Sequence, residues 1–204
     1  MCIPFVVQDF LFFFHNMIHT AFYTKSIDFL KKSQNIYHLY DYLSDESQEV
    51  RYRIHEFLLT QYGYSGKLTK SSSGIPIPVI LPWGERWYWS LSHTEKYVAY
   101  IFSDTPCGID IIEHISRSED LLLLHKKEEY WIVWWSLWDA FYIIWSAKEA
   151  LIKKLSLLLD DMTSIEIVDC SISHNSCILR YMGIEHTVSY MQKSKFTLSY
   201  TFSF

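Results

Sequence analysis

The chain of 204 residues is long enough for one large domain or for two smaller halves that share a core. Half of its residues are hydrophobic and 18% are aromatic, which excludes a disordered or collagen-like chain. Its formal net charge of -5 provides no general basic surface for neutralising the phosphates of a nucleic acid. We therefore expect a globular protein that does not bind nucleic acid, in which any anion site gathers its positive charges locally.

An apolar segment near the N-terminus, residues 3–18, resembles a membrane anchor in composition only. Asp9, His15 and Asn16 interrupt it, and its uninterrupted run is far shorter than the roughly 20 residues of a membrane-spanning helix. It also has no basic flank and no small-residue cleavage site. We expect a core element in a cytoplasmic protein without a membrane segment. Four cysteines without zinc-ligand spacing are expected to be reduced thiols. They are Cys2, Cys107, Cys170 and Cys177.

The first half of the chain is expected to contain helices followed by strands. Residues 26–62 are expected to be helical, because apolar residues recur at helical spacing up to Gly63, which can end a helix. Residues 64–84 are rich in Gly, Ser and Pro and predict loops. Aromatic and β-branched runs then predict strands at Trp87–Leu91, Tyr97–Phe102 and Cys107–Ile112.

The second half repeats this order. Residues 119–155 predict helix and include a very aromatic stretch from Tyr130 to Trp145. The segment Lys96–Ser103 is weakly similar to Lys195–Ser203 after a one-residue adjustment, which is consistent with a duplicated unit. Segregated helices and strands favour the α+β class. Three or four strands are expected near the C-terminus, at Ser164–Cys170, Cys177–Tyr181, His186–Met191 and Phe196–Phe204.

Three short segments could carry chemistry, and the first is the predicted strand end Trp89-Ser90-Leu91-Ser92-His93. A hydroxyl and an imidazole at the end of a strand can meet an anion together with backbone donors. The alternative is a surface strand end with a solvated histidine.

The second segment places Asp110 in an otherwise apolar strand that begins at Gly108. Burial of a carboxylate is costly unless the group is paired or bound to a cation. Mg²⁺ suits such a site, because it takes one or two carboxylates and leaves its other positions to water and phosphate. The alternative is an aspartate that caps a turn or pairs with a lysine.

The third segment is helical and places Trp145, Glu149 and Lys153 on one face, at positions i, i+4 and i+8. An acid and a base on one stripe could bind a metal and a phosphate side by side. The alternative is an exposed Glu–Lys ion pair, which contributes only about 0.3–0.5 kcal/mol.

Together the three segments resemble the 4'-phosphopantetheinyl transferases of the surfactin-synthetase-activating class, over about residues 40–165. That family shows an S-x-S-H strand, a G-[IV]-D segment and a W-x-x-K-E-[AS] helix with a lysine four residues after the acid. The matching residues here are Ser90-Leu91-Ser92-His93, Gly108-Ile109-Asp110, Trp145-Ser146-Ala147-Lys148-Glu149-Ala150 and Lys153.

The resemblance implies a monomeric α+β pseudo-dimer, with similar halves at residues 1–105 and 106–204 and coenzyme A in the cleft between them. Its implied activity moves the 4'-phosphopantetheine arm of coenzyme A onto a serine of an acyl or peptidyl carrier protein and releases 3',5'-ADP. Asp110 and Glu149 would hold Mg²⁺, and Lys153 would contact the pyrophosphate. A serine hydroxyl is a poor nucleophile at neutral pH, so a general base must take its proton, and Glu149 is the best candidate, directly or through a metal-bound water. The implied coenzyme contacts are Arg51, Arg53, Ser92, His93, Lys148 and Lys153, with Lys67 and Lys70 as further candidates.

Three positions depart from the family pattern. Ile112 stands where a second strand acid is frequent, Ile75 replaces a loop lysine, and Ser90 replaces an asparagine. Strand alternation points Glu113 to the face opposite Asp110 unless the strand ends or bulges there. We therefore expect two protein carboxylates on the metal, with water or Glu113 as the further ligand. Glu129 lies near a further family acid. These departures keep open a degenerate member that binds coenzyme A or a carrier protein without transfer, and an interaction protein that uses its aromatic surface.

Overall fold

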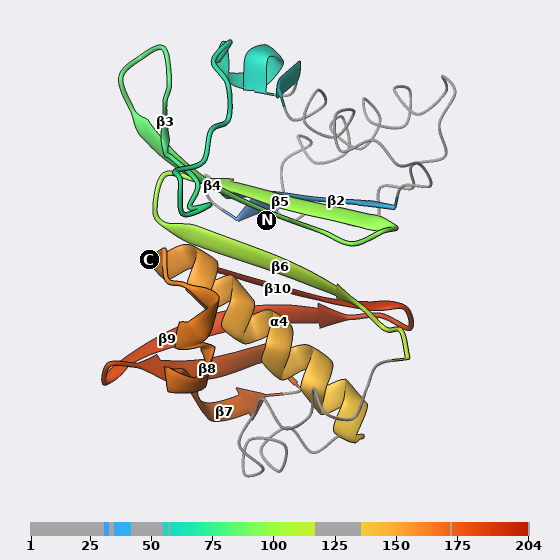
Figure 1. Cartoon of the computed structure of the whole chain (residues 1–204). Helices are drawn as coiled ribbons and strands as arrows, with labels where there is room; N and C mark the ends of the chain where they lie inside the picture. Colours follow the sequence, from blue (N-terminus) through green and yellow to red (C-terminus); the bar gives the residue numbers. More distant parts are fainter. Residues whose placement is uncertain are drawn as a thin grey trace, which may run out of the picture.

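The computed structural model describes residues 31–32, 35–41, 55–56, 58–116, 136–171 and 173–203 (Figure 1). Several expectations therefore lie outside the described residues. They concern the apolar segment 3–18, the cations Arg51 and Arg53, the acid Glu129 and the aromatic residues 130–135.

The described residues form two five-stranded sheets in which every neighbouring pair of strands is antiparallel. The N-terminal sheet has the order β1-β2-β5-β4-β3. Its strands are β1 (Lys31–Lys32), β2 (Asn35–Asp41), β3 (Val79–Ile80), β4 (Arg86–His93) and β5 (Tyr97–Ser103).

The expectation of helix throughout residues 26–62 is wrong for β1 and β2. The β2 segment is rich in aromatic and β-branched residues, which favour strands. It pairs with β5 along its length, from Ile36 opposite Phe102 to Asp41 opposite Tyr97. This non-local pairing determines the strand conformation of β2, and the local sequence has no periodicity that predicts it.

The end of the predicted helix at Gly63 is confirmed. Residues 58–62 are helical, and Gly63 has a φ of 62°, the left-handed conformation that glycine adopts without steric cost. Its backbone N–H donates to the carbonyl oxygen of Leu59 over 2.9 Å. The chain therefore leaves this helix at a glycine, as the sequence predicts.

The C-terminal sheet has the order β6-β10-β9-β8-β7 and is covered by one long helix, α4 (Figure 1). The strands predicted in this part of the chain are confirmed with small shifts of their ends. Its elements are β6 (Cys107–Glu113), α4 (Leu137–Leu155), the short 3-10 helix η2 (Leu159–Ser164), β7 (Glu166–Ser171), β8 (Ser176–Tyr181), β9 (Ile184–Gln192) and β10 (Phe196–Phe202).

Both ends of α4 are fixed by serines. The Ser136 hydroxyl accepts a hydrogen bond from the backbone N–H of Asp139 over 3.2 Å, which satisfies one of the free donors at the helix start. Ser156 ends the helix in the left-handed conformation, with a φ of 57°. Lys153 and Lys154 lie in the last turn, where positive charge is favoured by the helix dipole.

Small residues let α4 lie very close to the sheet. A Cβ added at Gly108 of β6 would overlap the carbonyl oxygen of Ala150 and would lie 2.7 Å from the backbone nitrogen of Lys154. Deeper along the helix, the hydroxyls of Ser146 and Ser199 are hydrogen-bonded over 2.7 Å. This close approach fixes where the last two turns of α4 stand relative to β6.

The strand β6 is the edge strand of the C-terminal sheet that packs against the N-terminal sheet (Figure 1). Its odd-numbered residues join a hydrophobic cluster with β5 and β10. The buried members of this cluster are Cys107, Ile109 and Ile111, with Tyr97, Ala99, Ile101, Phe196, Leu198 and Phe202. None of the helices in the described ranges is long and apolar enough to cross a membrane.

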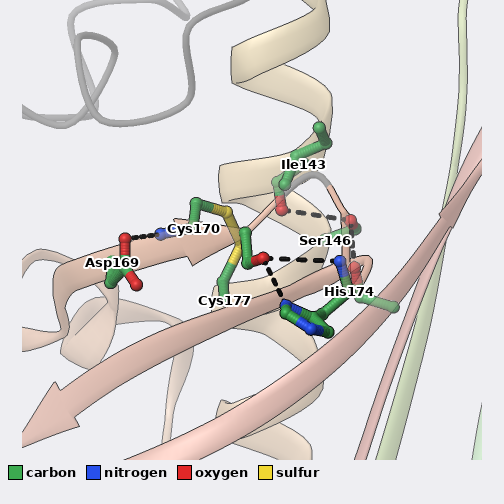
Figure 2. Close-up of a disulfide and its surroundings, with 8 residues drawn as sticks. Ile143, Ser146, Asp169, Cys170, His174 and Cys177 are labelled. Carbon is green, nitrogen blue, oxygen red and sulfur yellow. Dashed lines mark hydrogen bonds between the residues drawn. A yellow bond between two sulfur atoms is a disulfide. The ribbon is translucent and has the colours of Figure 1, made fainter.

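A disulfide joins Cys170 and Cys177, which are opposite residues of the β7–β8 hairpin (Figure 2). The expectation that all four cysteines are reduced thiols is therefore wrong for this pair, because the strand register brings the two side chains together. Cys107 is a free, buried thiol, and burial raises its pKa well above the ordinary value.

Candidate functional site

Asp110 is a buried acid of β6, with 5% of its surface exposed. Two donors converge on its Oδ1 atom: the Ser92 hydroxyl of β4 and the Lys153 ammonium of α4, each at 2.7 Å. Three elements from both halves of the molecule thus meet at one carboxylate. The structure brings together the key residues of all three motif segments.

Glu149 is the second acid of this cluster. Its Oε2 atom lies 3.8 Å from Lys153 Nζ, one helical turn away on α4. Burial raises the pKa of Glu149, and the negative charge of Asp110 raises this pKa further, while Lys153 opposes both effects. Two carboxylates therefore share one ammonium, and the cluster formed by Asp110, Glu149 and Lys153 carries a net charge of about -1 when both acids are ionised.

The donor set of this cluster fits a hard divalent cation. Within the described ranges, no group of three or more His, Cys, Asp and Glu side chains could hold a metal ion. Two carboxylates with a net negative charge are nevertheless what Mg²⁺ takes from proteins, because water and phosphate supply its other ligands. Asp110 and Glu149 are the residues that could hold it.

The two strand residues after Asp110 have other roles. Ile112 lies on the same face as Asp110 and packs against Phe141 and Tyr142 of α4. Glu113 lies on the opposite face and pairs with Lys96 of the N-terminal half. The register of β6 against β10 is continuous, so no bulge turns Glu113 towards Asp110. The alternation expected from the sequence is confirmed.

The remaining expected coenzyme contacts are dispersed. His93 is exposed at the end of β4. Lys148 is 1% exposed on α4, and it points about 100° around the helix from its neighbour Glu149. Lys67 and Lys70 are exposed in the loop after the first helix. Of the expected anion contacts in the described residues, Lys153 and Ser92 join the cluster.

A pocket next to the cluster shares Lys153 with it and lies between the two halves. Lys154 of this pocket is not among the predicted site residues, although the Lys-Lys pair at the end of the predicted helix is a signal for it. Lys154 donates to the carbonyl oxygen of Phe202 over 3.2 Å, and burial lowers its pKa. The pocket is lined by Pro76, Pro78, Tyr88, Trp89, Pro106, Cys107, Lys153, Lys154 and Ser156.

The lining of this pocket combines flat apolar side chains with two ammonium groups. Such a lining suits an anionic group, because the two lysines can neutralise its charge.

Residues 106–200 match the family model of the 4'-phosphopantetheinyl transferase superfamily. This segment contains the three charged residues of the cluster, Asp110, Glu149 and Lys153, whereas Ser92 and His93 precede it. No curated protein matches the chain. The family match supports a transferase of the phosphopantetheinyl type.

Proposed function

We propose that this protein is a magnesium-dependent 4'-phosphopantetheinyl transferase of the surfactin-synthetase-activating class, which modifies a serine of an acyl or peptidyl carrier protein. One observation carries the proposal: the acids of two distant motifs, Asp110 and Glu149, share the ammonium of Lys153 beside a pocket. A family match over the same segment supports it.

The strand order supports the pseudo-dimer that we propose for the fold. In the N-terminal sheet, β5 lies between β2 and β4, and in the C-terminal sheet β10 lies between β6 and β9. In both sheets the last strand of the half thus lies between the strand that precedes it and an early strand of the half, β2 or β6. We propose halves at residues 1–105 and 106–204, with coenzyme A in the cleft between them and a monomer as the active unit.

Glu149 is the proposed general base. A serine hydroxyl is a weak nucleophile at neutral pH and needs a group that takes its proton. Burial and the charge of Asp110 raise the pKa of Glu149, which makes its carboxylate a better proton acceptor. The serine oxygen forms a bond to the β-phosphorus of coenzyme A, the bond from that phosphorus to 3',5'-ADP breaks, and Glu149 keeps the proton.

Cations of the chain offset the negative charge of the pyrophosphate and of the leaving 3',5'-ADP. Bound Mg²⁺ would supply the largest share of this charge neutralisation. Lys153 and Lys154 line the pocket. His93, Lys148, Arg51 and Arg53 are proposed as further coenzyme contacts on the family resemblance alone.

Transfer is tested by the intact mass of an apo-carrier protein after incubation with coenzyme A, Mg²⁺ and the enzyme. We expect the carrier to gain one phosphopantetheine arm, and Glu149→Gln to abolish this gain while the fold is kept. Glu166→Gln is the matched control, because Glu166 pairs with Arg180 at the edge of the C-terminal sheet. Wild-type turnover by Glu149→Gln, or no gain with the unmodified enzyme, contradicts the proposal.

A degenerate protein that binds coenzyme A or a carrier protein without transfer is the second candidate. The observation that favours it is Ile112, which fills the place of a second strand acid and packs on Phe141 and Tyr142. The same assay separates the two candidates. Binding of coenzyme A by calorimetry without any mass gain on several carrier proteins identifies the degenerate protein.

A further inference from the structure

Two serines of β4 connect the N-terminal half to neighbouring residues of β6. The backbone N–H of Ile109 donates to the Ser90 hydroxyl over 3.2 Å, and the Ser92 hydroxyl donates to Asp110 Oδ1 over 2.7 Å. Both serines are buried, with 1% and 7% of their surface exposed. Their roles differ, because Ser90 holds the backbone of β6 while Ser92 holds the carboxylate of the cluster.

The position of the two donors on Asp110 fixes the orientation of this carboxylate. Ser92 and Lys153 both donate to Oδ1, and none of the described residues donates a hydrogen bond to the other oxygen, Oδ2. Rotation of the carboxylate would exchange the two oxygens and break both bonds. Ser92 and Lys153 together therefore determine which oxygen of Asp110 remains available to a further ligand.

We propose that Ser92 is a positioning residue that presents Oδ2 of Asp110 to the divalent cation. The inference rests on the proposed function, because that function assigns the cation to Asp110 and Glu149. It differs from the coenzyme contact that the family resemblance implies for Ser92. Partners that orient a metal ligand typically change metal affinity or activity by about 10–100-fold when they are removed.

The test uses the full chain and Mn²⁺ alone, whose binding is measured from the loss of the free-ion signal in electron paramagnetic resonance. We expect Ser92→Ala to weaken Mn²⁺ binding about tenfold. Ser92→Thr keeps a hydroxyl and should restore the affinity. Ser90→Ala is the matched control, because this serine lies on the same strand and binds β6 without contacting the carboxylate.

A purely structural role of Ser92 predicts a different pattern. The two alanine variants would then lower the melting temperature alike and leave Mn²⁺ affinity unchanged, which overturns the inference. Weakened coenzyme A binding in the absence of metal, with unchanged Mn²⁺ affinity, assigns Ser92 to the coenzyme and also overturns it. Should Ser92→Ala not fold, the nearly isosteric Ser92→Cys, a weaker donor, must show reduced affinity; wild-type affinity in that variant overturns the inference.

Failure of the proposed function gives a separate result. Mn²⁺ binding is measured without a carrier protein, so the inference is decided even where no arm is transferred. A chain that binds Mn²⁺ through Asp110 and transfers nothing contradicts the proposed function alone. A wild-type chain that binds no Mn²⁺ overturns the inference.

Discussion

The N-terminal and C-terminal sheets have corresponding strand orders, but residues of very different size lie between each sheet and its helix. In the N-terminal half, Leu58 of the helix packs into a cluster of large rings. In the C-terminal half, Ala150 lies directly over Gly108, and Ser146 contacts Ser199. The rings of the N-terminal cluster belong to Trp87, Trp89, Tyr100 and Phe102.

One pair of corresponding positions shows the difference most clearly. When β5 and β10 are aligned from their first residues, Tyr100 corresponds to Ser199. Tyr100 is paired in register with His38 of β2, whereas Ser199 is paired with Asp110 of β6. Ser199, the small residue of the pair, lies where α4 approaches the sheet and is paired with Asp110. Close packing of helix on sheet thus accompanies the acid cluster, whereas the described residues of the N-terminal half pack through aromatic rings.

The largest loss of stability is expected from adding a side chain at the close contact between β6 and α4 in the C-terminal half. Gly108→Ala places a Cβ against the backbone of Ala150, which no side-chain movement relieves. We expect a loss of about 3 kcal/mol in the free energy of unfolding, measured in urea, together with loss of transfer. Gly66→Ala is the control in the N-terminal half, because its Cβ meets the movable end of the Tyr64 ring. Equal effects of the two variants would contradict the importance of the close contact.

The disulfide is a second feature in which the halves differ among the described residues. Reduction of the bond between Cys170 and Cys177 should lower the free energy of unfolding by about 2.5 kcal/mol, because a short loop in the unfolded chain is released. Transfer should change less, since β7 lies at the sheet edge opposite β6. Urea unfolding with and without dithiothreitol measures the effect.

A double serine variant at Cys170 and Cys177 is the control, and its stability should not respond to dithiothreitol. Alkylation of the denatured protein gives an independent check on the bond. Reduction should add two labels, at Cys170 and Cys177. Four labels before reduction would refute the disulfide.

The shared ammonium of the cluster gives the third prediction. Lys153→Met leaves the acids Asp110 and Glu149 without their common cation, and we expect a loss of about 2 kcal/mol, because Asp110 is buried while Lys153 is partly exposed. Mg²⁺ should then raise the melting temperature by more than it does in the wild type, since a divalent ion replaces the missing charge. Calorimetric melting with and without Mg²⁺ measures this difference.

Lys154→Met is the matched control for this experiment. Lys154 is adjacent in the chain but donates to the carbonyl of Phe202 instead of to an acid of the cluster. Its removal should leave the stabilisation by Mg²⁺ at the wild-type value. An equal gain from Mg²⁺ in both lysine variants would mean that the ion does not bind at the shared acids.

The sequence predicted the C-terminal half well, because its signals are local. The strands β6 and β10 appear as aromatic and β-branched runs, and the stripe of Glu149 and Lys153 follows from helical spacing. Glu149 and Lys153 come close to Asp110 because Gly108 and Ala150 are small enough for α4 to approach β6. The sequence does not predict this approach, because a small residue does not indicate which element packs against it.

The misassigned parts depend on contacts far apart in the chain. The strand β2 is held by β5, about 60 residues later, and pairing over that distance leaves no periodic pattern in residues 26–62 that would predict a strand. Likewise, the disulfide follows from the register of β7 against β8, which cysteine spacing does not disclose. The position of Ser92 at a strand end predicts a contact with an anionic ligand, whereas in the structure its hydroxyl donates to Asp110.

The smallest loss of stability is expected from a substitution at Glu113, which follows Asp110 on β6 and lies on the face of the strand opposite α4. It pairs with Lys96 of the N-terminal half, so Glu113→Gln should weaken this contact between the halves and lower the melting temperature slightly. Mn²⁺ affinity should remain that of the wild type, whereas Asp110→Asn should reduce it by at least tenfold, because Asp110, unlike Glu113, belongs to the cluster around Lys153. Comparable losses in both variants would place Glu113 in the metal shell and would require β6 to bulge on binding the ion.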